Sequence, residues 1–248
     1  MRAHAGLGFW RLMMQPDDNA LIICRNLAIG YDNEAVVEKI SLEIRRGEFL
    51  PFIGPNGSGK TTLLRTILGL LQPLSGELIH PFSQQPPGYV PQVSTLDRLY
   101  PVTAREVITM GLYPRLGLWQ KPDRQMREQI DSYLQRFNLL QHAERTLNEL
   151  SGGMRQKVMI ARALVSGAEV LIMDEPAAGL DEQSEFDLIE LLYRLAREEQ
   201  KTVLFAQHSL DPIIGLANEV FRLYQGQSGR LPLYALLSAR NLRHIDKE

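Results

Sequence analysis

The chain has 248 residues, of which 44% are hydrophobic, and its 27 basic and 29 acidic side chains leave a net charge of −2. This length predicts one substantial globular domain, and the near-balance of charge gives no electrostatic reason to expect nucleic acid as a partner. The single cysteine, Cys24, rules out an internal disulfide and indicates a buried thiol in a reducing compartment. No stretch approaches the roughly 20 consecutive apolar residues that cross a bilayer, so we expect a soluble, cytoplasmic chain.

Strand-like sequence begins only near Leu21, so we expect residues 1–20 to be an N-terminal extension, of which about the first dozen are dispensable to the fold. Three short apolar runs then follow, separated by polar or glycine-containing turns, and they predict strands over residues 21–29, 36–44 and 48–53. Pro51 lies in the third run, where proline removes a ladder hydrogen bond, and a local bulge is expected there.

The third strand leads into a glycine-rich loop and then into a predicted helix over residues 60–71. The loop matches the pattern GxxxxGK[ST] and reads Gly54, Pro55, Asn56, Gly57, Ser58, Gly59, Lys60, Thr61, with Thr62 next. Its glycines let backbone N–H groups converge on a phosphate at the positive end of a helix. Lys60 is placed to contact the β- and γ-phosphates, and the Thr61 hydroxyl to bind Mg²⁺. The alternative, a glycine-rich turn with a solvated lysine, is disfavoured by the flanking strand and helix.

A proline- and glutamine-rich connection over residues 81–88 marks a boundary before a helical region. Apolar residues in that region recur at spacings of three and four, which predicts one apolar helix face: Met126, Ile130, Tyr133, Leu134 and Phe137. We therefore expect a helical subdomain inserted over about residues 93–165.

A serine and two glycines, Ser151, Gly152 and Gly153, begin the next predicted helix. Ser151 suits the N-cap and the glycines leave the N-terminal amides bare, so the segment predicts a second anion-binding site. One nucleotide needs only one phosphate loop, and a second site makes sense if it completes the site of another subunit. A helix cap without any ligand stays the alternative for this segment considered alone.

Strand and helix alternate in the last third of the chain, with a strand over residues 170–173, a helix over 182–199 and a strand over 202–206. This alternation favours a parallel sheet covered by helices. Asp174 and Glu175 follow the first of these strands, and carboxylates at that end face the crevice where ligands bind. We expect Asp174 to hold the metal and Glu175 to act as general base toward water; an ordinary strand-end turn is the alternative for the pair in isolation.

These motifs, in this order, resemble the ATP-binding cassette (ABC) family, and the resemblance covers nearly all of residues 21–224, leaving residues 225–248 as a C-terminal appendage. It implies an α/β fold of the P-loop NTPase type, with a mostly parallel central sheet, an antiparallel β subdomain and the inserted helical subdomain. Four further positions match family features: Tyr31 the aromatic that stacks on adenine, Gln92 the glutamine loop, Asp181 the aspartate loop and His208 the switch histidine. Each of these residues, taken alone, could instead have a structural role in packing or in a turn. The resemblance is supported by their order and spacing along the chain.

The resemblance implies a division of roles among these residues. Each ATP lies between Tyr31 and residues 54–62 of one subunit and the segment from Ser151 to Gly153 of the other. Glu175, His208 and Gln92 are the catalytic residues, Thr61, Gln92 and Asp174 hold Mg²⁺, and Asp181 couples the two sites of the dimer. Met154 stands where the family usually has a glutamine, so we hypothesise that hydrolysis survives with altered nucleotide affinity.

The resemblance further implies an ATPase that energises a transporter, with ATP and Mg²⁺ as cofactors. The expected partners are a second copy of the chain or a homologous ATPase subunit, a multispanning membrane permease and an extracytoplasmic substrate-binding protein, but no nucleic acid. The expected location is the cytoplasmic face of the inner (plasma) membrane, as a peripheral subunit. Residues 100–111 look like a segment found in importers of zinc or manganese and, less closely, of iron chelates, with generic packing as the alternative.

Two other functions remain as alternatives to metal import. A soluble ABC ATPase acting on DNA or ribosomes typically has a long coiled-coil insertion or a second cassette, and a basic surface. Here the insertion is short, the cassette is single and the net charge is −2. A P-loop kinase would leave the segment from Ser151 to Gly153, and Asp181, without a purpose.

Overall fold

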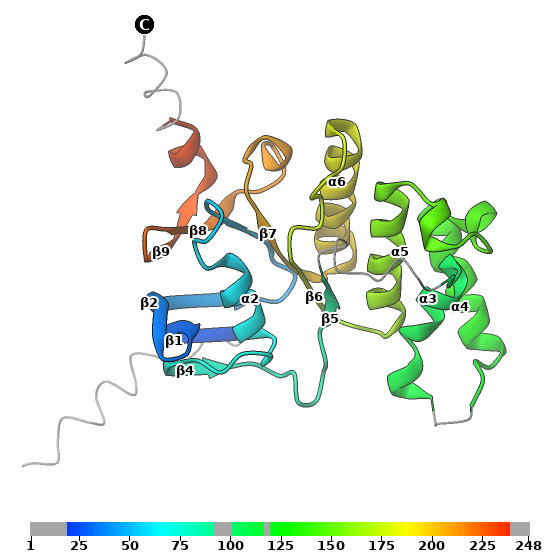
Figure 1. The fold of residues 1–248 in the computed structure, drawn as a ribbon, viewed down its shortest axis with the longest axis horizontal. Helices are drawn as coiled ribbons and strands as arrows, with labels where there is room; N and C mark the ends of the chain where they lie inside the picture. Colours follow the sequence, from blue (N-terminus) through cyan, green and yellow to red (C-terminus); the bar gives the residue numbers. More distant parts are fainter. Residues whose placement is uncertain (1–18, 92–100, 117–119, 239–248) are drawn as a thin grey trace, which may run out of the picture.

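The protein is described here by a computed structural model, which describes residues 19–91, 101–116 and 120–238. Two sheets form its framework (Figure 1). An antiparallel sheet has the order β2-β1-β4 and contains β1 (Ala20–Tyr31), β2 (Glu34–Arg45) and β4 (Ser75–Ile79). A second sheet has the order β5-β6-β7-β3-β8-β9 and contains β3 (Phe49–Ile53), β5 (Gly88–Val90), β6 (Val170–Met173), β7 (Thr202–Gln207), β8 (Glu219–Tyr224) and β9 (Gln227–Pro232). Its strands pair in parallel from β5 to β8, and only β9 pairs antiparallel.

The sheets are accompanied by the α-helices α2 (Lys60–Ile67), α3 (Ala104–Met110), α4 (Arg124–Arg136), α5 (Gly152–Val165) and α6 (Glu182–Glu199), and residues 233–238 are also helical. Short 3-10 turns join these elements: η2 (Tyr113–Arg115), η3 (Leu140–His142), η4 (Leu147–Glu149) and η5 (Asp211–Ile213). In Figure 1, α3 and α4 lie on the far side of α5 from α6, so the helical region extends to one side of the central sheet. The fold class predicted from the sequence is confirmed, with a mostly parallel sheet, an antiparallel sheet and an added group of helices.

The hydrophobic core has two parts, one on each face of the central sheet. Along β7, Leu204 and Ala206 pack with α2 and the antiparallel sheet, whereas Val203 and Phe205 pack with α5 and α6. All four side chains are fully buried. Because successive side chains of a strand point to opposite faces, a strand covered on both faces reads as a continuous apolar run, which is what the sequence of β7 shows.

The helical region is held together by local caps and close packing. Thr103 caps α3, accepting a hydrogen bond from Glu106 N, while the Glu106 carboxylate accepts one from Thr103 N at 2.8 Å. A Cβ atom at Gly111 would lie 2.1 Å from Arg162 O on α5, so α3 ends where only a glycine allows the two helices to approach. Among the described residues, no helix is long and apolar enough to cross a membrane.

The sheet continues past residue 224, where the C-terminal appendage is predicted to begin. Strand β9 pairs with β8 along its whole length, from Tyr224↔Gln227 to Glu219↔Pro232. Arg230 on β9 ties it to both sheets, since its guanidinium pairs with Glu48 and donates to Glu43 O at 2.6 Å. The residues at 227–232 are therefore part of the framework, and their polar, glycine-containing sequence gives no strand pattern.

Pro51 produces no bulge, and that expectation is wrong. Pairing of β3 with β7 runs without a register shift from Phe49↔Val203 to Ile53↔Gln207. Glu48 O accepts a hydrogen bond from Val203 N, so by alternation the polar groups of Pro51 point away from β7, toward β8. Pairing of β3 with β8 starts only at Phe52, and the missing N–H of the proline falls before that ladder begins.

Candidate functional site

Three strands of the central sheet end side by side at one edge. The register pairs Ile53 of β3 with Gln207 of β7, and Met173 of β6 with Phe205 of β7. The glycine-rich loop, Asp174 with Glu175, and His208 therefore all follow strands that end at this edge. In open parallel sheets, ligands bind outside the carboxyl ends of the strands.

The glycine-rich loop wraps tightly from β3 into α2. A Cβ atom at Gly54 would lie 2.2 Å from Leu223 O on the neighbouring strand β8, so only glycine fits there. Gly59 occupies the N-cap of α2, and no side chain caps the helix. The uncapped N–H groups of the first turn therefore remain available to an anionic ligand.

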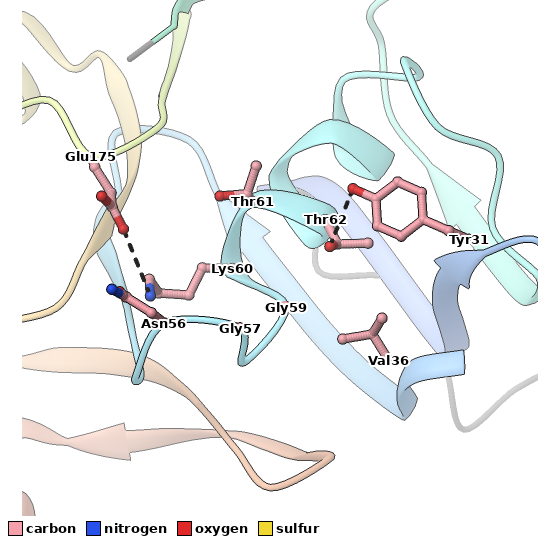
Figure 2. A pocket seen from close by; sticks show the side chains of 9 residues that line it. All are labelled: Tyr31, Val36, Asn56, Gly57, Gly59, Lys60, Thr61, Thr62 and Glu175. Carbon is pink, nitrogen blue, oxygen red and sulfur yellow. Dashed lines mark hydrogen bonds and ion pairs between the residues drawn. The ribbon is translucent and has the colours of Figure 1, made fainter. Parts of the chain in front are cut away.

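Lys60 is the buried cation of this loop. Its side chain is 4% exposed, and Nζ donates to Gly54 O at 2.8 Å and to Pro55 O at 3.1 Å. Glu175 Oε1 lies 3.9 Å from the same Nζ, and a dashed line marks this ion pair in Figure 2. Burial lowers the pKa of Lys60, and the nearby Glu175 and Asp174 carboxylates oppose that shift. The ammonium group is thus fixed between the loop carbonyls and an acid at the end of β6.

Thr61 and Asp174 bring a hydroxyl and a carboxylate together beside the loop. Thr61 Oγ1 donates to Asp174 Oδ1 at 2.8 Å, and the Asp174 side chain is nearly buried. A hydroxyl and one carboxylate suit Mg²⁺, which typically takes one or two protein oxygens together with phosphate and water. The described residues contain no group of three or more His, Cys, Asp or Glu side chains that could hold a metal without such help.

An open pocket of about 410 Å³ lies beside the loop, lined by Tyr31, Val36, Asn56, Gly57, Gly59, Lys60, Thr61, Thr62 and Glu175 (Figure 2). Tyr31 is 45% exposed, and Thr62 Oγ1 lies 3.5 Å from its hydroxyl. An exposed aromatic face near a phosphate-binding loop can stack on a planar base. Val36 also lines this pocket, and sequence analysis missed it because a valine in a strand gives no signal of binding.

Ser151 and Asp181 lie together, apart from that pocket. Ser151 caps α5, accepting a hydrogen bond from Met154 N at 3.3 Å, and Asp181 caps α6, accepting one from Ser184 N at 2.9 Å. The hydrogen bonds from Ser184 lower the pKa of Asp181. A Cβ atom at Gly152 would lie 2.9 Å from Leu180 Cδ2, which places the two helix starts in contact. Ser151 to Gly153 and Asp181 do not line the pocket of Lys60 in the part of the chain that the structure describes.

Of the remaining predicted site residues, the structure describes His208 and Met154 but not Gln92. His208 directly follows β7 and is exposed at the sheet edge. Gln92 lies outside the described residues. Met154 is partly buried, and its side chain packs against the core shared by α5 and α6, so an apolar contact occupies the position expected for a polar glutamine.

Comparison with known proteins agrees with this geometry. The pattern that defines the ABC transporter family matches residues 37–178, more than half of the chain. The zinc uptake system ATP-binding protein ZurA of Listeria innocua is 37% identical, over 83% of this chain and 83% of that protein. The manganese transport system ATP-binding protein MntB of Bacillus subtilis is also 37% identical, over 75% of this chain and 76% of that protein.

Two solved structures extend the comparison to three dimensions. An inward-facing conformation of an ABC transporter assigned to the metal-chelate type has a TM-score of 0.81 and 28% identity, covering 90% of this chain and 88% of that one. A dimeric ATP-binding cassette in a post-hydrolysis state, bound to ADP and Pi, has a TM-score of 0.72 and 26% identity, covering 86% of this chain and 99% of that one. The chain therefore belongs to the ABC transporter family, as one of its ATP-binding, ATP-hydrolysing subunits.

Proposed function

We propose that this chain hydrolyses ATP to energise the import of a metal ion, with zinc or manganese as the favoured substrates and a metal chelate as the wider class. The observation that carries the proposal is the likeness to ZurA and MntB, which covers at least three quarters of both chains at 37% identity. The helix α3, which belongs to the segment that resembles metal importers, supports the same assignment.

The pocket beside the glycine-rich loop is the proposed ATP site. Tyr31 stacks on the adenine, the amides of residues 54–62 bind the phosphates, and Lys60 leaves its loop carbonyls to contact the β- and γ-phosphates. Thr61, Asp174 and Gln92 would hold Mg²⁺, which when bound neutralises charge on the phosphate oxygens. Catalysis at such a site is mainly positioning and stabilisation of charge.

Glu175 is the proposed general base. Its carboxylate is 23% exposed at the end of β6, close enough to the Lys60 ammonium to share the phosphate site with it. From there it would orient or deprotonate the attacking water, while His208 and Gln92 contact the γ-phosphate side. The left-handed backbone at Glu175, with φ of 48°, is a strained conformation of the kind that clusters at functional sites.

A second copy of the chain, or a homologous subunit, completes each site. Ser151 to Gly153 lie apart from the pocket of Lys60, as expected if they bind the ATP of the other subunit. Asp181, in contact with that segment through Leu180, would couple the two sites. The similarity to a dimeric cassette with bound ADP and Pi supports this arrangement. A multispanning permease and an extracytoplasmic substrate-binding protein are the other proposed partners, and the proposed location is the cytoplasmic face of the inner (plasma) membrane, as a peripheral subunit.

The Glu175→Gln substitution tests the catalytic part of the proposal. The amide keeps the size of the side chain but cannot take a proton, so the variant is expected to bind ATP and dimerise while barely hydrolysing it. Undiminished turnover would remove Glu175 from this role.

Uptake of labelled zinc and manganese tests the physiological part. Cells that lack the chain should lose uptake of one of these metals, and wild type but not Glu175→Gln should restore it. Recovery of the chain with a multispanning membrane protein supports transport, whereas recovery with ribosomes or DNA favours the soluble-ATPase alternative. Unchanged uptake of both metals in the deletion strain would contradict import of zinc or manganese and leave a metal chelate as the substrate to test.

A further inference from the structure

Gln207, the residue before His208, is a buried polar side chain bonded to another element. It is 2% exposed, and its Nε2 donates to Glu185 Oε1 on α6 at 2.7 Å. Glu185 is itself partly buried. A short hydrogen bond to a charged acceptor is stronger than one between neutral groups, and partial removal from water strengthens it further. The contact therefore anchors the end of β7 to the beginning of α6.

The position of Gln207 in the strand gives this anchor its importance. Val203 and Phe205 face the core of α5 and α6, and by alternation Gln207 continues the same face. It is also the last residue of β7 that pairs with β3, opposite Ile53. His208 follows immediately, beyond the ladder, where backbone pairing no longer holds the chain.

The other end of the anchor lies in the first turn of α6. Glu185 N donates to Asp181 O at 2.9 Å, and Asp181 caps the helix through Ser184 N. Gln207 is therefore connected to Asp181 through one hydrogen bond, to Glu185, and the first turn of α6.

We propose that Gln207 and Glu185 are positioning residues whose hydrogen bond fixes the start of the His208 loop relative to the turn capped by Asp181. The proposal rests on the proposed function, in which His208 contacts the γ-phosphate and Asp181 couples the sites. Beyond His208, Ser209 bonds within its own loop, to Asp211 at 3.3 Å. Gln207 restrains this loop from the side of β7, directly before His208.

The charges around the pair make it sensitive to one substitution. Glu185 shares an open cleft of about 620 Å³ with Asp181, Glu182 and Asp211, and the described residues that line this cleft include no basic side chain. Gln207→Glu would place a second carboxyl group at hydrogen-bonding distance from Glu185, near the three other acids of the cleft. The pair would then hold together only when it shares a proton, which requires the pKa of one carboxyl to rise.

Steady-state ATP hydrolysis by the full chain tests the proposal. Gln207→Glu should lower kcat about tenfold at neutral pH, with the KM for ATP little changed, and should regain activity as the pH falls and the carboxyl pair takes up a proton. Gln207→Glu combined with Glu185→Gln restores an amide–carboxylate bond with the partners exchanged, and should recover most of kcat at neutral pH. Gln183→Glu is the matched control, because Gln183 donates to Asp187 at the same 2.7 Å on the exposed face of α6. Water screens that pair, so its kcat should stay near the wild-type value.

His208→Ala separates failure of this proposal from failure of the proposed function. If His208→Ala loses turnover while Gln207→Glu keeps it, the positioning role is wrong and the function of His208 stands. If Gln207→Glu loses turnover but the exchanged pair does not restore it, the loss reflects general damage and the positioning role is also wrong. Wild-type turnover by His208→Ala would remove His208 from the proposed mechanism, and the positioning role with it.

Discussion

Two glycines with nearly the same φ separate the cost of folding from the cost of binding. Gly57 in the loop has φ of 77° and Gly69, just after α2, has φ of 74°. A Cβ atom at either position meets no atom within 4 Å. Alanine should therefore cost about 1–2 kcal/mol of folding free energy at each site through the left-handed backbone alone. For a chain of this length, each kcal/mol corresponds to a fall in Tm of about 2–4 °C.

Only Gly57 lines the proposed ATP pocket, so the two variants should differ in binding. We expect Gly57→Ala to raise the Kd for a non-hydrolysable ATP analogue about tenfold, since the loop must shift its phosphate-binding amides. At an analogue concentration of about 100 times the wild-type Kd, binding stabilises wild type and Gly69→Ala by about 2.7 kcal/mol, but Gly57→Ala by only about 1.4 kcal/mol.

Thermal unfolding with and without the analogue measures both the cost to folding and the loss of ligand binding. Without ligand, the Tm of the two alanine variants should fall below that of wild type by similar amounts. With ligand, Gly69→Ala should recover the full wild-type increase and Gly57→Ala about half of it. Equal ligand-induced increases in both variants would refute the assignment of the loop as the phosphate site.

Substitutions at three further positions test other parts of the site and fold. Thr61→Ser should keep most Mg²⁺-dependent turnover because the hydroxyl beside Asp174 remains, whereas Thr61→Ala should lose at least about tenfold; equal activity of the two would contradict the metal assignment. The hydrogen bonds from Thr103 lower the pKa of Glu106, so its contribution to stability is present above the unfolded-state pKa and lost as pH falls through the lower folded-state value. The free energy of unfolding, measured with urea at several acidic pH values, should therefore depend less on pH in Glu106→Gln than in wild type. The same pH dependence in both proteins would be evidence against that linkage. Met154→Gln places an amide against apolar packing and should lower stability by about 1 kcal/mol, while unchanged ATP affinity and turnover would refute the hypothesis that Met154 alters nucleotide affinity.

The parts of the fold predicted from sequence are those that local pattern determines. The glycine-rich loop, the cap at Ser151 and the apolar stripe of α4 each depend on neighbours within a few positions. Strands β4 and β5 escaped prediction because β4 is mostly exposed and β5 has only three residues, so neither shows alternation.

Features set by distant pairing could not be predicted. The order of the central sheet, with β7 between β6 and β3, depends on contacts across more than a hundred residues. The absence of a bulge at Pro51 depends on where the β3–β8 ladder starts, and the bond between Gln207 and Glu185 depends on how α6 lies on the sheet. At the site, the motifs and their family resemblance predicted both the chemistry and the assignment of Ser151 to the other subunit's ATP, whereas Val36 as a lining residue of the pocket required the fold.

ATP turnover per subunit, measured across a range of subunit concentrations, tests the central claim that two chains build each site. The account predicts that specific activity rises with concentration until dimers saturate, and that Ser151→Ala lowers turnover although the phosphate loop is intact. Specific activity that stays constant at concentrations where the protein is shown to be monomeric would contradict it.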